Sequence, residues 1–223
     1  MTRFKNVVTA GLLTGGIIAS WSFEALAKGG IGIFGSLFYA KDSLDSDLLD
    51  SQSTTTVTTS GNAINLGGGY IFDIGLYLGA KYLQFSSSRE VSVTGATDIA
   101  SPSTKTETVF GAPGLSVGFV ANKGFYILGS GLVNPEETVE TTTINGTTTS
   151  YAKSVVGGVF GYALDVGFTY RMTPSFGLGP QITYMSATFN KYNSVSSGSK
   201  VTGDLKNYKE SKIYPFLAMS LVL

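Results

Sequence analysis

Residues 155 to 170 read VVGGVFGYALDVGFTY, and in this stretch large apolar side chains alternate with glycine and with small or polar residues. An alternation with a period of two is typical of a β-strand whose two faces meet different surroundings. One face carries Val156, Phe160, Tyr162, Leu164, Val166 and Phe168. The other face carries Gly157, Gly161, Ala163, Asp165, Gly167 and Thr169. We expect the bulky apolar face to contact lipid and the small face to line a narrow interior.

Seven further apolar, glycine-rich segments are separated by turn residues or by stretches rich in Ser, Thr, Asn and Asp, as in an all-β protein. They span residues 29 to 40, 62 to 72, 75 to 85, 108 to 120, 125 to 133, 176 to 189 and 211 to 223. Tilted strands of about 9 to 11 residues cross a bilayer, so nearly all of these segments are long enough. The sequence therefore predicts an all-β fold, an eight-stranded antiparallel up-and-down transmembrane β-barrel. Segment 125 to 133, FYILGSGLV, is apolar on both faces, and its orientation stays open.

Charged residues are almost absent from these segments. The chain has 15 basic and 15 acidic residues, yet only Lys81, Asp165 and Lys212 lie inside the eight segments. A water-soluble barrel needs a charged outer surface, which three charges cannot supply. An α-helical membrane protein is the main alternative, because residues 115 to 133 form an apolar window. That window contains Asn122-Lys123-Gly124 and a period of two, which indicate two strands and a turn.

The first residues have the pattern of an export signal. Arg3 and Lys5 precede an apolar stretch that leads to Ala25-Leu26-Ala27, a small-x-small site of the kind that signal peptidase cuts. The stretch has about 17 residues and is shorter than the helix of about 20 that spans a membrane comfortably. We expect residues 1–27 to be a cleaved signal peptide and residues 28–223 to be the outer-membrane barrel domain.

The connections between segments alternate in length, which predicts an orientation. In outer-membrane barrels short turns face the periplasm and long loops face the exterior. We therefore expect both termini in the periplasm and the long loops outside the cell. The short connections are residues 72 to 74, 121 to 124 and 171 to 175, and the long ones are residues 41 to 61, 86 to 107, 134 to 154 and 190 to 210.

The alternation places all three rare charges on the interior face. There we expect a polar network of Lys81, Asp165, Gln181, Lys212 and Tyr214, with Glu210 as a further candidate. A buried charge without a partner costs several kcal/mol, so Asp165 should pair with one of the two lysines. One interpretation is a plug of ion pairs, to which Phe34, Phe38, Phe110 and Phe216 add bulk, and the other is a constriction in a thin water path. The interior of eight strands is barely wide enough for side chains, which favours the plug.

A hairpin signal stands out among the polar stretches. Asn145-Gly146 is flanked on both sides by Thr-rich sequence, which predicts a two-residue type I′ turn with Thr143 opposite Thr148 and Thr141 opposite Ser150. One interpretation is an adhesive surface, because exposed strand edges bind extended partners. The other is a loop that is merely stiff.

Residue types that are missing exclude several functions. The chain has no Cys and no His, which removes disulfides, thiolate nucleophiles and the commonest metal ligand. Its charges are balanced without a basic cluster, which leaves no electrostatic attraction to nucleic acid. We predict no cofactor and no metal site.

With these features the chain resembles the small eight-stranded outer-membrane barrels of Gram-negative bacteria, the class that includes the OmpA transmembrane domain, OmpX and OmpW. The similarity covers residues 28–223 and rests on the architecture and on the alternating last strand IYPFLAMSLVL, although members usually end in an aromatic residue and this strand ends in Leu223. The resemblance implies a structural or surface-interaction role, with outer-membrane lipid and lipopolysaccharide as neighbours and an extracellular protein or surface as partner of the loops. The alternative, from OmpW-like members, is a narrow passive pore or a carrier for small or apolar molecules. Barrel enzymes of this membrane use His for acid–base chemistry, so the prediction is that this chain is not an enzyme.

Overall fold

The computed structural model describes residues 29–47, 54–94, 102–121, 123–145, 148–196 and 199–223, so the predicted signal peptide lies outside the described residues. All of its regular structure is β. The strands are β1 (Gly30–Asp47), β2 (Thr54–Ile71), β3 (Leu76–Thr94), β4 (Ser103–Val120), β5 (Phe125–Val133), β6 (Glu136–Asn145), β7 (Thr148–Phe168), β8 (Tyr170–Arg171), β9 (Phe176–Ser196) and β10 (Ser199–Val222). Within the described ranges, no helix is long and apolar enough to cross a membrane.

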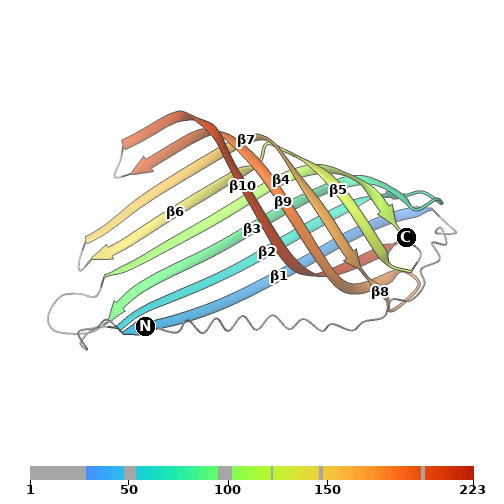
Figure 1. Ribbon diagram of the computed structural model, residues 1–223, viewed down its shortest axis with the longest axis horizontal. Coiled ribbons are helices and arrows are strands. Elements are labelled where there is room, and N and C mark those ends of the chain that lie inside the picture. Colours follow the sequence, from blue (N-terminus) through green and yellow to red (C-terminus); the bar gives the residue numbers. More distant parts are fainter. Residues whose placement is uncertain (1–28, 48–53, 95–101, 122, 146–147, 197–198) are drawn as a thin grey trace, which may run out of the picture.

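The strands close into one antiparallel ring (Figure 1). β1 to β4 pair in sequence order, and β10 pairs with both β9 and β1. β5 and β6 both lie between β4 and β7, so they occupy one position in the wall, and the short β8 continues the line of β7 beside β9. The wall therefore has eight strand positions, which confirms the predicted eight-stranded antiparallel barrel.

The strands are much longer than predicted. β1, β2 and β4 have 18 residues each, and β10 has 24. Most of residues 41–61, 86–107, 134–154 and 190–210, predicted as long loops, belong to strands, so that prediction is wrong. The first three of these stretches are rich in Thr, whose branched side chain favours extended backbone, whereas residues 190–210 contain one Thr. They lack the apolar alternation because neither of their faces needs to contact lipid.

The faces of the wall follow the predicted alternation near the short turns at residues 72–75, 123–124 and 172–175, an end that we call the short-turn end. Exposed apolar side chains cover the outside of residues 31–39, 64–72, 76–83, 109–120, 125–133, 160–168, 176–184 and 213–223, which we call the apolar band. Aromatic side chains border this band, as in the girdles of outer-membrane barrels. Tyr70, Phe72 and Tyr170 lie at the short-turn end, and Tyr39, Tyr82, Phe160 and Tyr162 lie at the other border.

The strand that the sequence left unassigned is settled by burial. Tyr126, Leu128 and Leu132 point into the barrel, whereas Ile127 and Val133 are exposed on the outside. Both faces of β5 are apolar because the interior at this level is itself apolar.

A bulge interrupts the wall between β5 and β6. Gly114 pairs with Leu132 and Gly111 with Glu136, so the β5–β6 line has one residue more than β4 at this point. Asn134 takes up the extra length with a left-handed φ of 47°. An extra residue reverses the faces of a strand, and the inward side changes from the even-numbered Leu132 to the odd-numbered Glu137.

On the neighbouring strand β7, the side chains that face inward also change from odd-numbered to even-numbered residues at this level of the barrel. The register of β7 with β9 is irregular between Gly157 and Phe160. Beyond this irregularity Val156 packs against the interior cluster of apolar residues. The prediction that Val156 faces lipid together with Phe160 is therefore wrong.

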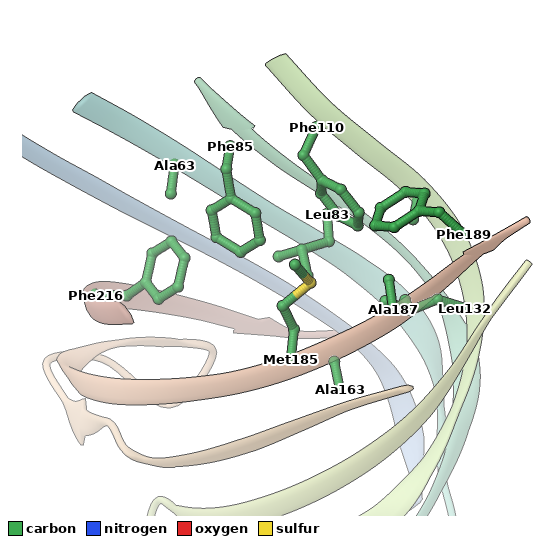
Figure 2. Packing of buried hydrophobic residues seen from close by; sticks show 11 residues of the cluster. Ala63, Leu83, Phe85, Phe110, Leu132, Ala163, Met185, Ala187, Phe189 and Phe216 are labelled. Carbon is green, nitrogen blue, oxygen red and sulfur yellow. The ribbon is translucent and has the colours of Figure 1, made fainter. Parts of the chain in front are cut away.

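The core of the protein is the filled interior of the barrel. Figure 2 shows the larger apolar cluster, whose side chains converge from opposite sides of the wall. Its members are Ala63, Leu83, Phe85, Phe110, Ala112, Leu132, Ala163, Met185, Ala187, Phe189 and Phe216, and we call it the aromatic plug. A second cluster, which includes Phe34, Ile71, Tyr77, Tyr126 and Leu128, lies nearer the short-turn end.

The ring is joined by a short seam. β1 and β10 pair over residues 31–37 and 217–223, which makes seven residue pairs when the hydrogen bonds between Ile31 and Leu223 are included. Beyond these pairs the two strands diverge, with β1 in blue and β10 in red in Figure 1.

Candidate functional site

A buried ion pair crosses the interior of the barrel within the apolar band. Lys81 on β3 and Asp165 on β7 meet with an Nζ–Oδ2 distance of 2.7 Å, and their side chains are only 3% and 4% exposed. Their strands are not neighbours in the ring, so the pair spans the lumen. Pairing of opposite charges lowers the large free energy of burying either one alone.

Hydrogen bonds complete the surroundings of the Asp165 carboxylate. Its Oδ1 accepts bonds from Thr183 Oγ1 at 2.8 Å, Asn65 Nδ2 at 3.2 Å and Gln181 Nε2 at 3.4 Å. The hydroxyl of Tyr126 donates to Gln181 Oε1 at 2.7 Å. We call these six residues, Lys81 and Asp165 included, the inner network. They come from β2, β3, β5, β7 and β9.

Three of the inner-network residues, Lys81, Asp165 and Gln181, were predicted from the sequence, whereas Asn65, Tyr126 and Thr183 were not. A signal for Asn65 was present, because it is the only strongly polar residue of the segment AINLGGGY and shares a face with the buried Ala63. Tyr126 gave no signal, since its segment is apolar on both faces.

The space left around this network is small. The cavity lined by Lys81, Asp165, Gln181 and their neighbours has a volume of about 10 Å³. A single water molecule needs about 10 to 15 Å³. The interior at this level is thus closed to anything larger than water.

The aromatic plug closes the barrel a second time, further from the short-turn end. Tyr214 stacks on Phe85 with ring centroids 4.0 Å apart and planes inclined by 15°. Phe110 meets Phe189 edge-on at 6.4 Å. Tyr214, predicted to join the polar network, instead packs by its ring against the plug.

Lys212 belongs to a separate group on the far side of the plug. Its Nζ lies 2.5 Å from Glu210 Oε1 and 3.1 Å from Glu137 Oε2, and 5.9 Å from the centre of the Phe110 ring. We call Glu137, Glu210 and Lys212 the outer network. The five residues predicted as one network are therefore divided, and Glu137 was missed because it was assigned to a loop.

Two carboxylates share one ammonium group in the outer network. Burial raises the pKa of Glu137 to about 7 from 4.5, and Glu210 adds to the rise while Lys212 opposes it. Glu137 lies on β6, outside the apolar band. Its protonated form is therefore favoured by the folded state.

This shift predicts a pH dependence of stability. The contribution of Glu137 should be fully present below about pH 4.5 and be lost as the pH rises through about 7, since its folded pKa lies above its unfolded value. We expect the melting temperature of the detergent-refolded barrel to fall over this range, and to fall less in Glu137→Gln. Glu107→Gln, at an exposed position, is the control. Equal slopes for wild type and Glu137→Gln would contradict the assignment.

The predicted hairpin exists with a different register. Asn145 pairs with Thr148 and Thr143 with Ser150, so the predicted opposition of Thr143 with Thr148 and of Thr141 with Ser150 is wrong. Asn145 takes part in the last pair of the ladder, whereas the sequence placed it in the turn. Gly146 lies outside the described residues. The Glu140–Lys153 ion pair, with an oxygen–nitrogen distance of 2.7 Å, crosses this hairpin.

Comparisons with known proteins give one finding at the level of fold. No family model matches the chain, and a search of curated proteins found no relative. Among solved structures it is similar to the outer membrane protease OmpT from Escherichia coli, with 11% identity, a TM-score of 0.39 and coverage of 89% of this chain and 95% of that chain.

This comparison corrects one prediction and leaves another open. The prediction that the chain is not an enzyme is contradicted, because the barrel that it resembles is a protease. A similarity this distant assigns no catalytic role to any side chain. The ring topology and the apolar outer wall are those of an outer-membrane β-barrel. The narrower resemblance to OmpA, OmpX and OmpW is not shown.

Proposed function

We propose that this outer-membrane β-barrel acts as a closed structural anchor for a surface sheet, whose Thr-rich hairpin binds partners outside the cell. The observation that carries the proposal is the filled interior, with a residual cavity of about 10 Å³ at the inner network. The aromatic plug blocks the same axis at another height. Closure favours an anchoring role over the alternative of a narrow pore.

Electrical recordings test the closed interior. The refolded barrel should give no ionic steps in a planar lipid bilayer at neutral pH, because the inner network and the aromatic plug fill the interior of the described part of the barrel. An open barrel of known conductance, inserted under the same conditions, shows that the assay reports pores. Regular steps from this protein would favour the pore.

Surface labelling tests the orientation. The chain has no Cys, so a single introduced cysteine reports its own position. Asn145→Cys should react with a membrane-impermeant maleimide on intact cells, whereas Ser175→Cys, in a short turn, should react only after the outer membrane is permeabilised. The reverse pattern would show that the barrel is inserted the other way round.

The hairpin can be shortened with the apolar band left intact, since its residues 140–144 pair only with residues 103–107 of β4 on that side, above the band. Val139 and Ser154 lie opposite each other, so replacing residues 140–153 by Asn-Gly should leave a tight turn at that pair. We expect the variant to keep its folded, heat-modifiable mobility on gels, and cells that produce it to be retained less on an epithelial cell layer. Thr141→Ser with Thr143→Ser is a matched control of full length. Unchanged retention would exclude the hairpin as the binding surface.

A further inference from the structure

The seam between β1 and β10 ends at a residue that cannot continue it. Ile31 and Leu223 exchange two backbone hydrogen bonds, of 3.0 and 2.9 Å. In an antiparallel ladder such pairs recur at every second residue, so the register runs through Leu37 and Leu217 and would next join Tyr39 to Pro215. Proline has no N–H to donate.

The same proline does not disturb the other side of β10. Val222 N donates to Ser175 O at 2.8 Å, so the even-numbered residues of β10 bond toward β9. The β9–β10 ladder accordingly continues past Pro215, which pairs with Ile182. Pro215 thus removes a donor only on the side of β10 that faces β1.

Two long strand edges remain unpaired beyond this point. Among the described residues, 38–47 of β1 and 199–216 of β10 have no ladder partner across the seam. The two edges run apart in Figure 1. Unpaired edges of this length are templates for another strand.

The charges of the two edges are opposite in sign. Residues 41–47 of β1 contain one Lys and three Asp, and residues 207–213 of β10, which the seam register would place opposite them, contain two Lys and one Glu. Two β1 edges would repel each other, and so would two β10 edges. A β1 edge and a β10 edge attract each other.

We propose that the occupant of these edges is a second copy of this chain. The β1 edge of each copy pairs antiparallel with the β10 edge of the other, around a two-fold axis parallel to the barrels. A second copy inserted in the same orientation presents both of its edges at the same height, just beyond the apolar band. Its strands then run antiparallel to those that they would join. In the seam register, reciprocal pairing joins residues 38–47 of each β1 edge to residues 207–216 of the other copy's β10 edge, and the two-fold axis closes the assembly. This inference goes beyond the proposed function and does not depend on the hairpin.

Two single-cysteine proteins test the pairing. Ser43 and Ser211 are both exposed and continue the seam register, since they would face each other if the ladder were extended. Ser43→Cys and Ser211→Cys are refolded together into lipid and oxidised. We expect a disulfide-linked species of twice the mass in the mixture, and much less in either variant alone. High salt during assembly should reduce its yield.

The controls separate this pairing from closure within one chain and from random contact. Ser87→Cys is exposed but pairs on both sides, with Gly61 and Thr108, so mixing it with Ser211→Cys should give little product. Equal product from this mixture would overturn the proposal. So would the absence of a linked dimer from correctly folded proteins, or a Ser43→Cys/Ser211→Cys double variant that forms only internally linked monomers.

Discussion

Replacing Lys81 with Met should lower the free energy of unfolding by about 3 to 5 kcal/mol, because it leaves the Asp165 carboxylate buried without its counter-charge. The Asp165 side chain is only 4% exposed, so water cannot take the place of the ammonium group. The cavity beside it is too small to admit more than about one water molecule. Urea unfolding of the barrel in detergent micelles or lipid vesicles, under conditions where it refolds, measures the loss.

A second substitution distinguishes loss of charge from loss of packing. Lys81→Met combined with Asp165→Asn removes both charges and keeps an oxygen that can accept the bonds of Thr183 and Asn65. Most of the lost stability should return. Lys105→Met removes an exposed ion pair with Glu107 and should leave stability nearly unchanged. A double variant as unstable as Lys81→Met would show that the lysine acts by its volume.

Replacing Phe110 with Ala should also cost about 3 to 5 kcal/mol, as expected for a large side chain removed from a tightly packed interior. Phe110 is fully buried and contacts Phe85 and Phe189, and the Lys212 ammonium lies over its ring. Its loss leaves a hole in the aromatic plug on the side that faces Lys212 of the outer network. The same unfolding experiment measures the effect, and Phe110→Leu, which keeps most of the volume, should lose much less.

The Phe110 substitution also bears on the closed interior. If the plug is what separates the two polar networks, Phe110→Ala with Phe85→Ala should increase the passage of protons or small ions across vesicles, relative to Phe110→Leu. A barrel that unfolds is recognised by the loss of its heat-modifiable mobility and is excluded from the comparison. A folded double variant that stays as tight as wild type would show that the inner network closes the barrel without the plug.

The lipid-facing half of the fold could be predicted from the sequence because lipid and lumen impose opposite demands on neighbouring residues. This is clear in the alternation of Leu164, Asp165 and Val166. Beyond the apolar band both faces of the wall meet polar surroundings, so the Thr-rich stretches carry no alternation and were interpreted as loops. Their true strand length comes from pairing with neighbouring strands, which a single sequence does not show.

The sequence predicted that charged residues lie in the interior, but not which of them form ion pairs. The parity of each strand placed Lys81 and Lys212 inside, but the height of each residue depends on the register between strands. That register puts Lys81 beside Asp165 and carries Lys212 past the plug to Glu137. The bulge at Asn134, which turns Glu137 inward, has no signal beyond the Asn-Pro dipeptide.

That same bulge divides the wall into two halves that can vary separately. Asn134 is the surplus residue between two stretches of regular pairing, so deleting it would give β4 and the β5–β6 line equal length, with Leu132 and Glu137 both still facing inward. A residue can therefore be lost at position 134 without shifting the register on either side, and this separates the membrane-embedded half of the wall from the outer half.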